Sequence, residues 1–252
     1  AVRISVDQIM GPGGVEADGD SVRLAELCTK HGLVDLWDVN ISDFNEWGED
    51  AAPSRQQKAN HQKPFTRFLR EVTTAPLLNV GRVTSPDDMA EIVSGGQADI
   101  IGAARPSIAD PFLPQKIFEG RNEDIRECIG CNICVASETT VGRFRCTQNP
   151  TAGEEFRRGW HPEKIDPKPE GNDDGVLIIG AGPAGLEAAR SLGMRGYDVH
   201  LVDARAEVGG RVIKEARLPG LAAWGRVASY RDIQIGKMKN VEVHLNIELS
   251  AK

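Results

Sequence analysis

The stretch "VLIIGAGPAGLEAARSLGMRGYDVHLVDA", Val176–Ala204, decides the fold of the C-terminal part of the chain. An apolar run leads into Gly180, Gly182 and Gly185, and a helix-like segment follows. A second apolar run then ends at Asp203, 18 residues after Gly185. A strand, a glycine-rich turn, a helix and a second strand ending in an acid predict a βαβ unit of the Rossmann type.

The glycines of this turn have separate expected tasks. Gly180 allows the tight turn, Gly182 lets the backbone approach a pyrophosphate, and Gly185 permits close packing of helix on strand. The helix N-terminus then faces the phosphates, and Asp203 is placed to bind the ribose hydroxyls, which argues against a 2′-phosphate. The nearby "EVGGR", which contains Gly210, favours an FAD or ADP ligand over NAD. The alternative is a glycine-rich turn without a ligand.

The first part of the chain alternates strand and helix patterns. Strands are expected at Val2–Val6, Leu33–Asn40, Ala75–Arg82 and Ala98–Arg105. Helices are expected at Ser21–Gly32, Lys63–Thr74 and Ser85–Gly95, with Ser21 and Ser85 as N-caps. Pro86 and Gly95 fit the first helical position and the stop signal of the third helix. Repeated βα units predict a parallel sheet, either a barrel or a doubly wound sheet.

Four of the five cysteines cluster in the middle of the chain, at Cys128, Cys131, Cys134 and Cys146. Three thiolates on one tight loop suit three corners of an iron–sulfur cube, and a remote fourth cysteine closes it. Gly130 lets the backbone bend between the ligands. We therefore predict one [4Fe–4S] cluster, with a zinc site and unliganded thiols as the alternatives.

The 252 residues are expected to form three parts. Residues 1–120 would be one βα domain, 121–170 the cluster segment and a linker rich in proline and glycine, and 171–252 the start of the nucleotide-binding domain. We expect the chain to be an internal piece of a longer protein. The net charge of −7 argues against binding to nucleic acid or anionic lipid. The sequence contains no apolar run long enough to predict a membrane span.

Four segments resemble the iron–sulfur flavoprotein amine dehydrogenases, which include trimethylamine, dimethylamine and histamine dehydrogenases. They are "EWGED", "ARPSIADPFLPQK", "RECIGCNICV" and "CTQNPTAGEEFRRGWHPEK". The resemblance implies an FMN-binding (β/α)8 TIM barrel, a [4Fe–4S] segment and a nucleotide-binding domain that holds ADP or FAD. Residues 1–120 would then be barrel strands five to eight.

The flavin site follows from the barrel geometry and from the resemblance. Barrel enzymes commonly bind phosphate with the loops after strands seven and eight. Gly81, Arg82 and Arg105 fall at those positions, where backbone N–H groups and guanidinium groups suit a phosphate dianion. The resemblance places Arg3 beside the flavin ring. A solvated surface charge is the alternative for each arginine.

The resemblance also implies a substrate site. Trp47 would supply an aromatic wall for a substrate ammonium, and Asp50 an active-site carboxylate. Glu138 stands where trimethylamine dehydrogenase has a second aromatic wall. A carboxylate there weakens a cage for a fully alkylated ammonium, so we expect a histamine- or dimethylamine-like substrate over trimethylamine.

The expected function is therefore oxidation of a small amine by FMN. Electrons would leave through the cluster to an external acceptor such as an electron-transferring flavoprotein. We expect a cytoplasmic homodimer at full length and an inactive fragment. The alternative enzyme is an NADPH-dependent 2,4-dienoyl-CoA or enoate reductase. The family of that reductase typically has three residues between the second and third cysteines, where this chain has Asn132 and Ile133. A non-catalytic electron-transfer or scaffold module is the third possibility.

Overall fold

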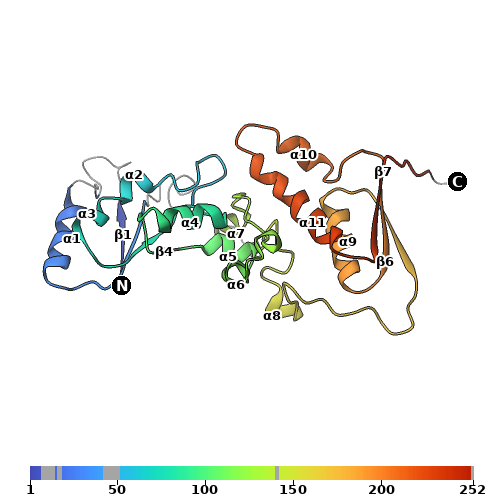
Figure 1. The fold of residues 1–252 in the computed structure, drawn as a ribbon, viewed down its shortest axis with the longest axis horizontal. Coiled ribbons are helices and arrows are strands. Elements are labelled where there is room, and N and C mark those ends of the chain that lie inside the picture. Colours follow the sequence, from blue (N-terminus) through green and yellow to red (C-terminus); the bar gives the residue numbers. More distant parts are fainter. Residues whose placement is uncertain (7–14, 16–18, 42–51, 140–141, 251–252) are drawn as a thin grey trace. The chain divides into compact units, whose positions relative to one another are not determined.

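A computed structural model describes residues 1–6, 15, 19–41, 52–139 and 142–250 (Figure 1). The chain forms two compact units, each with its own parallel sheet. The first unit comprises Ala1–Ser107 and Gly130–Thr140, and the second comprises Ile108–Ile129 and Val141–Lys252. None of the helices in the described part of the chain is both long and apolar enough to cross a membrane.

The first unit holds a four-stranded parallel sheet in which sequence neighbours are also spatial neighbours, in the order β1-β2-β3-β4. The strands are β1 (Val2–Val6), β2 (Trp37–Ile41), β3 (Leu77–Asn79) and β4 (Ile100–Ile101). A doubly wound sheet reverses its strand order at a switch point, whereas a barrel adds each strand beside the previous one. The observed order therefore favours the barrel, of which four strands form half.

The helices of the first unit are α1 (Asp20–Lys30), α2 (Lys63–Thr66), α3 (Leu69–Val72), α4 (Pro86–Ser94) and α7 (Ile133–Thr139). Helices α1 and α3 contribute to a core that alternate strand residues form, including Ile4, Val6, Trp37 and Val39. Helix α5 (Ala104–Ala109) contains the division between the two units. The single helix expected over Lys63–Thr74 is in fact the two short helices α2 and α3.

The predicted helix caps have mixed outcomes. Ser85 caps α4 by accepting a hydrogen bond from the Asp87 N–H at 3.2 Å, and Gly95 ends the helix, as predicted. Ser21 does not cap α1, because the helix already begins at Asp20 and Gly19 precedes it without a side-chain cap. Ser21 is instead buried in the first turn, where the acidic Asp20 faces the positive end of the helix dipole.

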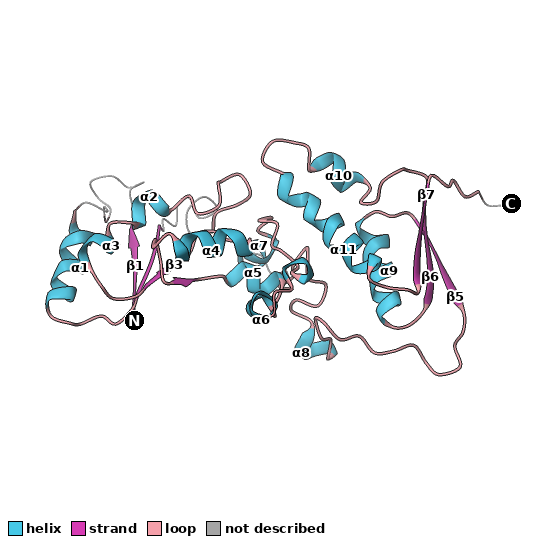
Figure 2. Ribbon diagram, viewed as in Figure 1, coloured by secondary structure: helices cyan, strands magenta, loops and turns pink. Residues whose placement is uncertain are grey.

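The second unit holds a three-stranded parallel sheet in the order β5-β6-β7. Its strands are β5 (Gly175–Ile179), β6 (Asp198–Asp203) and β7 (Val241–Leu245). Its other elements are α6 (Leu113–Phe118), α8 (Glu155–Arg158), α9 (Pro183–Met194), α10 (Arg211–Glu215), α11 (Arg226–Gly236) and 3₁₀ turns at Asn122–Asp124 and Ala222–Gly225. Helix α9 packs on the sheet and α11 packs on α9 (Figure 2). Leu186, Val199 and Leu201 are buried between them.

Candidate functional site

The first unit has a cavity of about 360 Å³ at the carboxyl ends of its strands. Arg3, Gly81, Arg82 and Arg105, the four residues predicted to bind FMN, all line it. Gly81 and Arg82 have φ values of 123° and 58°, so the chain turns sharply as it leaves β3. Such left-handed backbone is typical of turns that present N–H groups to anions.

Neutral oxygens hold the two arginines that were predicted to bind phosphate. Arg105 donates to the Pro53 carbonyl at 2.8 Å and to the side-chain oxygen of Asn132. Arg82 donates to the Gln57 carbonyl. These contacts orient the two guanidinium groups. A guanidinium group is a suitable partner for a phosphate dianion.

The cavity also contains one acid that sequence reasoning did not select. Asp38 pairs with Arg3 across β1 and β2, at 3.6 Å between their charged groups. Burial raises the pKa of Asp38, and the charge of Arg3 opposes that shift. Among the described residues that line the cavity, Arg3, Arg82 and Arg105 are basic and Asp38 is acidic, a lining that suits an anionic group such as a phosphate. Asp38 was missed because it lies inside a strand pattern.

In the second unit, the glycine-rich turn and the end of β6 form one hydrogen-bonded assembly. The carboxylate of Asp203 accepts from the Ala181 N–H at 2.7 Å and from the Arg205 N–H at 2.9 Å. The Arg205 bond holds the pKa of Asp203 below its ordinary value and the Ala181 bond adds to this, while burial opposes both. Asp203 thus positions the turn, a task that the sequence motif does not reveal.

Close approach explains the glycines of this turn. A Cβ atom on Gly185 would lie 1.9 Å from the Gly180 carbonyl oxygen, so helix and turn can pack only without a side chain. A Cβ atom on Gly210 would lie 3.1 Å from the Gly182 Cα, which shows that the two predicted glycines lie side by side. The residues of the predicted nucleotide site therefore lie together at this turn: Gly180, Gly182, Gly185, Asp203 and Gly210.

The four cysteines divide between the two units. Cys131 and Cys134 belong to the first, where Cys134 is buried in α7, and Cys128 and Cys146 belong to the second. Gly130 and Asn132 flank Cys131 with φ values of 65° and 58°, so the loop bends on both sides of it, as predicted for Gly130.

A backbone N–H already points at one of the sulfurs, since Gln148 donates to Cys146 Sγ at 3.4 Å. Hydrogen bonds of this kind, from a backbone N–H to a thiolate sulfur, support the cysteine ligands of iron–sulfur clusters.

Gln148 is the main supporting residue that sequence reasoning missed. Its side chain donates to the Glu127 carbonyl at 3.0 Å and accepts from Arg231 at 3.0 Å. Arg231 in turn pairs with Glu187 at 2.7 Å. Burial alone would raise the pKa of Glu187, yet the charges of Arg190 and Arg231 hold it below its ordinary value. This network fixes the backbone beside Cys128 and Cys146. No local sequence motif predicts the network, because its members are far apart in the chain.

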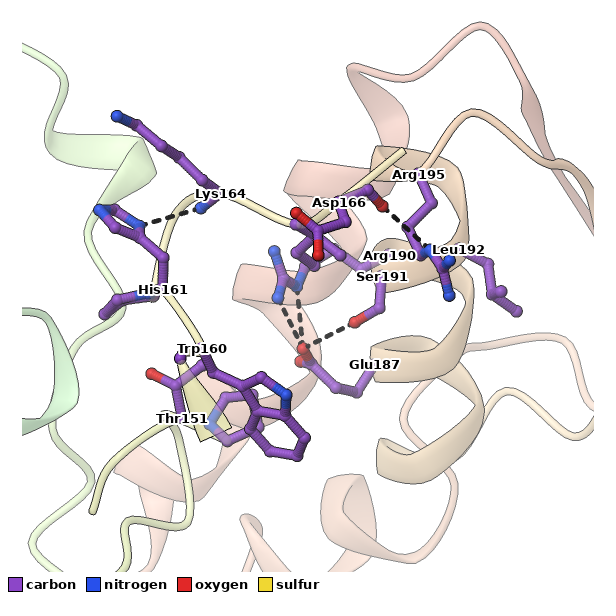
Figure 3. A pocket seen from close by; sticks show the side chains of 14 residues that line it. Thr151, Trp160, His161, Lys164, Asp166, Glu187, Arg190, Ser191, Leu192 and Arg195 are labelled. Carbon is purple, nitrogen blue, oxygen red and sulfur yellow. Dashed lines mark hydrogen bonds and ion pairs between the residues drawn. The ribbon is translucent and has the colours of Figure 1, made fainter. Parts of the chain in front are cut away.

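A second cavity, of about 470 Å³, lies in the second unit beside α9 (Figure 3). Glu187 accepts from Arg190 and Ser191 there, and Arg195 donates to the Asp166 carbonyl at 3.0 Å. His161 accepts from the Lys164 N–H at 3.1 Å. The contact between Arg195 and Asp166 ties the segment after the cysteines to the C-terminal end of α9, which indicates a structural role.

Three predicted substrate residues are not placed by the structure. Trp47 and Asp50 lie outside the described residues. Glu138 lies in α7, but its side chain is outside the described part of the chain.

Two family models match the chain. Residues 1–124 match the NADH:flavin oxidoreductase / NADH oxidase family, and residues 178–234 match NAD(P)-binding Rossmann-like domains. These matches and the parallel sheets confirm the predicted fold class, a half of a TIM barrel followed by a Rossmann-like domain.

Individual proteins are similar over nearly the whole chain. Dimethylamine dehydrogenase from Hyphomicrobium sp. (strain x) is 50% identical over 99% of this chain and 34% of its own length. The structure of histamine dehydrogenase from Rhizobium sp. 4-9 is 49% identical, with a TM-score of 0.89 over 98% of this chain and 35% of that one. The structure of 6-hydroxypseudooxynicotine amine oxidase from Pseudomonas geniculata N1 is 49% identical, with a TM-score of 0.90 over 98% of this chain and 36% of that one. The chain thus spans about a third of the length of these relatives.

Proposed function

We propose that the chain is part of a flavin-dependent amine dehydrogenase, because residues 1–124 match the NADH:flavin oxidoreductase / NADH oxidase family and the whole chain is similar to amine dehydrogenases. The observation that carries this proposal is the 50% identity to dimethylamine dehydrogenase, which extends over 99% of the chain. The similarity therefore includes the cysteine segment as well as the half-barrel.

FMN is proposed for the cavity of the first unit. Arg82 and Arg105, with the backbone of Gly81, would hold its phosphate, and Arg3 would lie at the ring. FMN bound there would accept the electrons of amine oxidation. The ion pair with Asp38 orients Arg3, and the hydrogen bond to the Pro53 carbonyl orients Arg105.

The [4Fe–4S] cluster is proposed to be held by Cys128, Cys131, Cys134 and Cys146, and it would pass single electrons onward. The Gln148 N–H directed at Cys146 would stabilise the charge on that sulfur. The proposed acceptor is an electron-transferring flavoprotein, and the proposed full-length assembly is a homodimer.

ADP is proposed for the glycine-rich turn of the second unit, with FAD as the alternative. Gly180, Gly182 and Gly185 open the backbone to a pyrophosphate, and Gly210 leaves room beside it. The Asp203 carboxylate accepts hydrogen bonds from two backbone N–H groups. A carboxylate has about four acceptor positions, so it can still accept hydrogen bonds from ribose hydroxyls.

The proposed substrate is a histamine- or dimethylamine-like amine. Trp47 and Asp50 would hold the ammonium group, and Glu138 would favour a substrate that keeps N–H donors. Turnover of dimethylamine, histamine and trimethylamine by the full-length enzyme tests this. Faster oxidation of trimethylamine than of the other two would contradict the preference.

The FMN site is tested by Arg105→Leu in the full-length protein, with the exposed Arg67→Leu as a matched control. Loss of a charge-assisted hydrogen bond is worth about 1.5–3 kcal/mol, so FMN affinity should fall roughly tenfold or more. Equal FMN affinity in the two variants would remove Arg105 from the phosphate site. The reductase alternative predicts reduction of bound flavin by NADPH instead of by amines.

A further inference from the structure

Three side chains on β6 and β7 form a group that the proposed function does not use. His200 pairs with Glu242 in the strand register, and Val202 pairs with His244. Paired residues on neighbouring parallel strands point to the same face, as do residues two apart on one strand. His200, Glu242 and His244 therefore share one face of the sheet.

This face is turned away from helix α9. Val199, Leu201 and Val241 point the other way and are buried. The three side chains are instead partly open, with exposed fractions of 43% for His200, 62% for Glu242 and 34% for His244. A small ion can therefore reach them from solvent.

Their ligand atoms are spaced as a metal would require. His200 Nδ1 lies 3.1 Å from His244 Nε2, and the Glu242 carboxylate lies 3.7 Å from the first nitrogen and 3.4 Å from the second. In a tetrahedral zinc site with bonds of about 2.0–2.1 Å, ligand atoms are roughly 3.3 Å apart. The three separations bracket that value.

We propose that His200, Glu242 and His244 bind Zn²⁺, with water at the fourth position. Two imidazoles and one carboxylate are a donor set that zinc takes, whereas Mg²⁺ and Ca²⁺ prefer oxygen ligands alone. The ion would bridge β6 and β7 on the face opposite α9. Without an ion, one imidazole N–H donates to the other ring and the site is a hydrogen-bonded histidine pair.

The test follows the histidine ring nitrogens by ¹H–¹⁵N NMR while Zn²⁺ is added to the 252-residue chain. This readout separates the proposed site from zinc bound to cysteine thiolates, because only ligating imidazoles shift. His200 Nδ1 and His244 Nε2 should shift together and saturate, and the exposed His31 should not move. Unshifted His200 and His244 nitrogens in excess Zn²⁺ would overturn the proposal.

Variants make the test quantitative. His244→Gln should weaken the binding measured at His200 by at least about tenfold, since even residues that only support a zinc ligand contribute 10–100-fold. His31→Gln is the matched control and should leave the affinity unchanged. If His244→Gln disturbs the fold, the more exposed Glu242→Gln supplies the same comparison. Equal zinc affinity at His200 in the folded variants and in the parent chain would overturn the zinc proposal. His200 and His244 would then be a hydrogen-bonded histidine pair only.

Discussion

Replacing Gln148 by alanine should lower the free energy of unfolding of the second unit. The side chain is 1% exposed and makes two hydrogen bonds, one to the Glu127 carbonyl and one from the Arg231 guanidinium. A neutral hydrogen bond contributes about 1 kcal/mol and one to a charged group about 1.5–3 kcal/mol. Arg231 keeps its contacts to Val227 and Glu187 in the variant, so we take the lower value, about 1.5 kcal/mol, for its hydrogen bond to Gln148. The expected loss is therefore about 2.5 kcal/mol, or roughly 60-fold in the folding equilibrium.

Urea denaturation followed by tryptophan fluorescence measures this loss. Gln115→Ala is a matched control, because Gln115 makes an exposed hydrogen bond to Glu119 and its replacement should cost less than about 0.5 kcal/mol. Gln148→Ala should also lower the amount of cluster retained, since the Gln148 backbone faces Cys146. A Gln148→Ala protein as stable as the Gln115→Ala control would refute the reasoning.

Three further outcomes follow from the fold. Gly185→Ala places a Cβ 1.9 Å from the Gly180 carbonyl, so it should abolish ADP binding and lower the melting temperature, whereas Gly236→Ala, with open space around it, should change neither. Burial alone would raise the pKa of Asp124, but hydrogen bonds from one amide and two basic side chains lower it to about 2, below its usual 3.8. The stability that Asp124 contributes is therefore present above about pH 4 and lost as pH falls toward 2, and Asp124→Asn should flatten this part of a pH–stability curve. Ser85→Ala removes the N-cap of α4 and should cost about 1 kcal/mol in urea denaturation; no change would mean that water replaces the cap.

Several elements could be predicted because their signals are local. The cap, first-turn proline and stop glycine of α4 lie within eleven residues of each other, and the structure places each as expected. The Rossmann turn was equally predictable, since Gly185 lies against Gly180, only five residues away. In the half-barrel, the residues that follow β3 and β4 meet in one cavity because parallel strands end at the same edge.

Other features depend on contacts between distant residues. Gln148 forms a hydrogen bond with Arg231, 83 residues later, and Asn132 forms one with Arg105. No sequence motif predicts either contact. The segment Lys63–Thr74 forms two short helices instead of one, and an apolar pattern of that length does not by itself stabilise a continuous helix. The face shared by His200 and His244 depends on the register of β6 and β7, which the sequence alone does not state.

The central claim is that one protein couples amine oxidation to a [4Fe–4S] cluster. The most direct measurement is electron paramagnetic resonance of the full-length protein after anaerobic addition of dimethylamine or histamine, without NADPH. We predict about four irons per chain, bleaching of the flavin and the signal of a reduced cluster. A flavin and cluster that stay oxidised with every amine but are reduced by NADPH would contradict the account and favour the reductase.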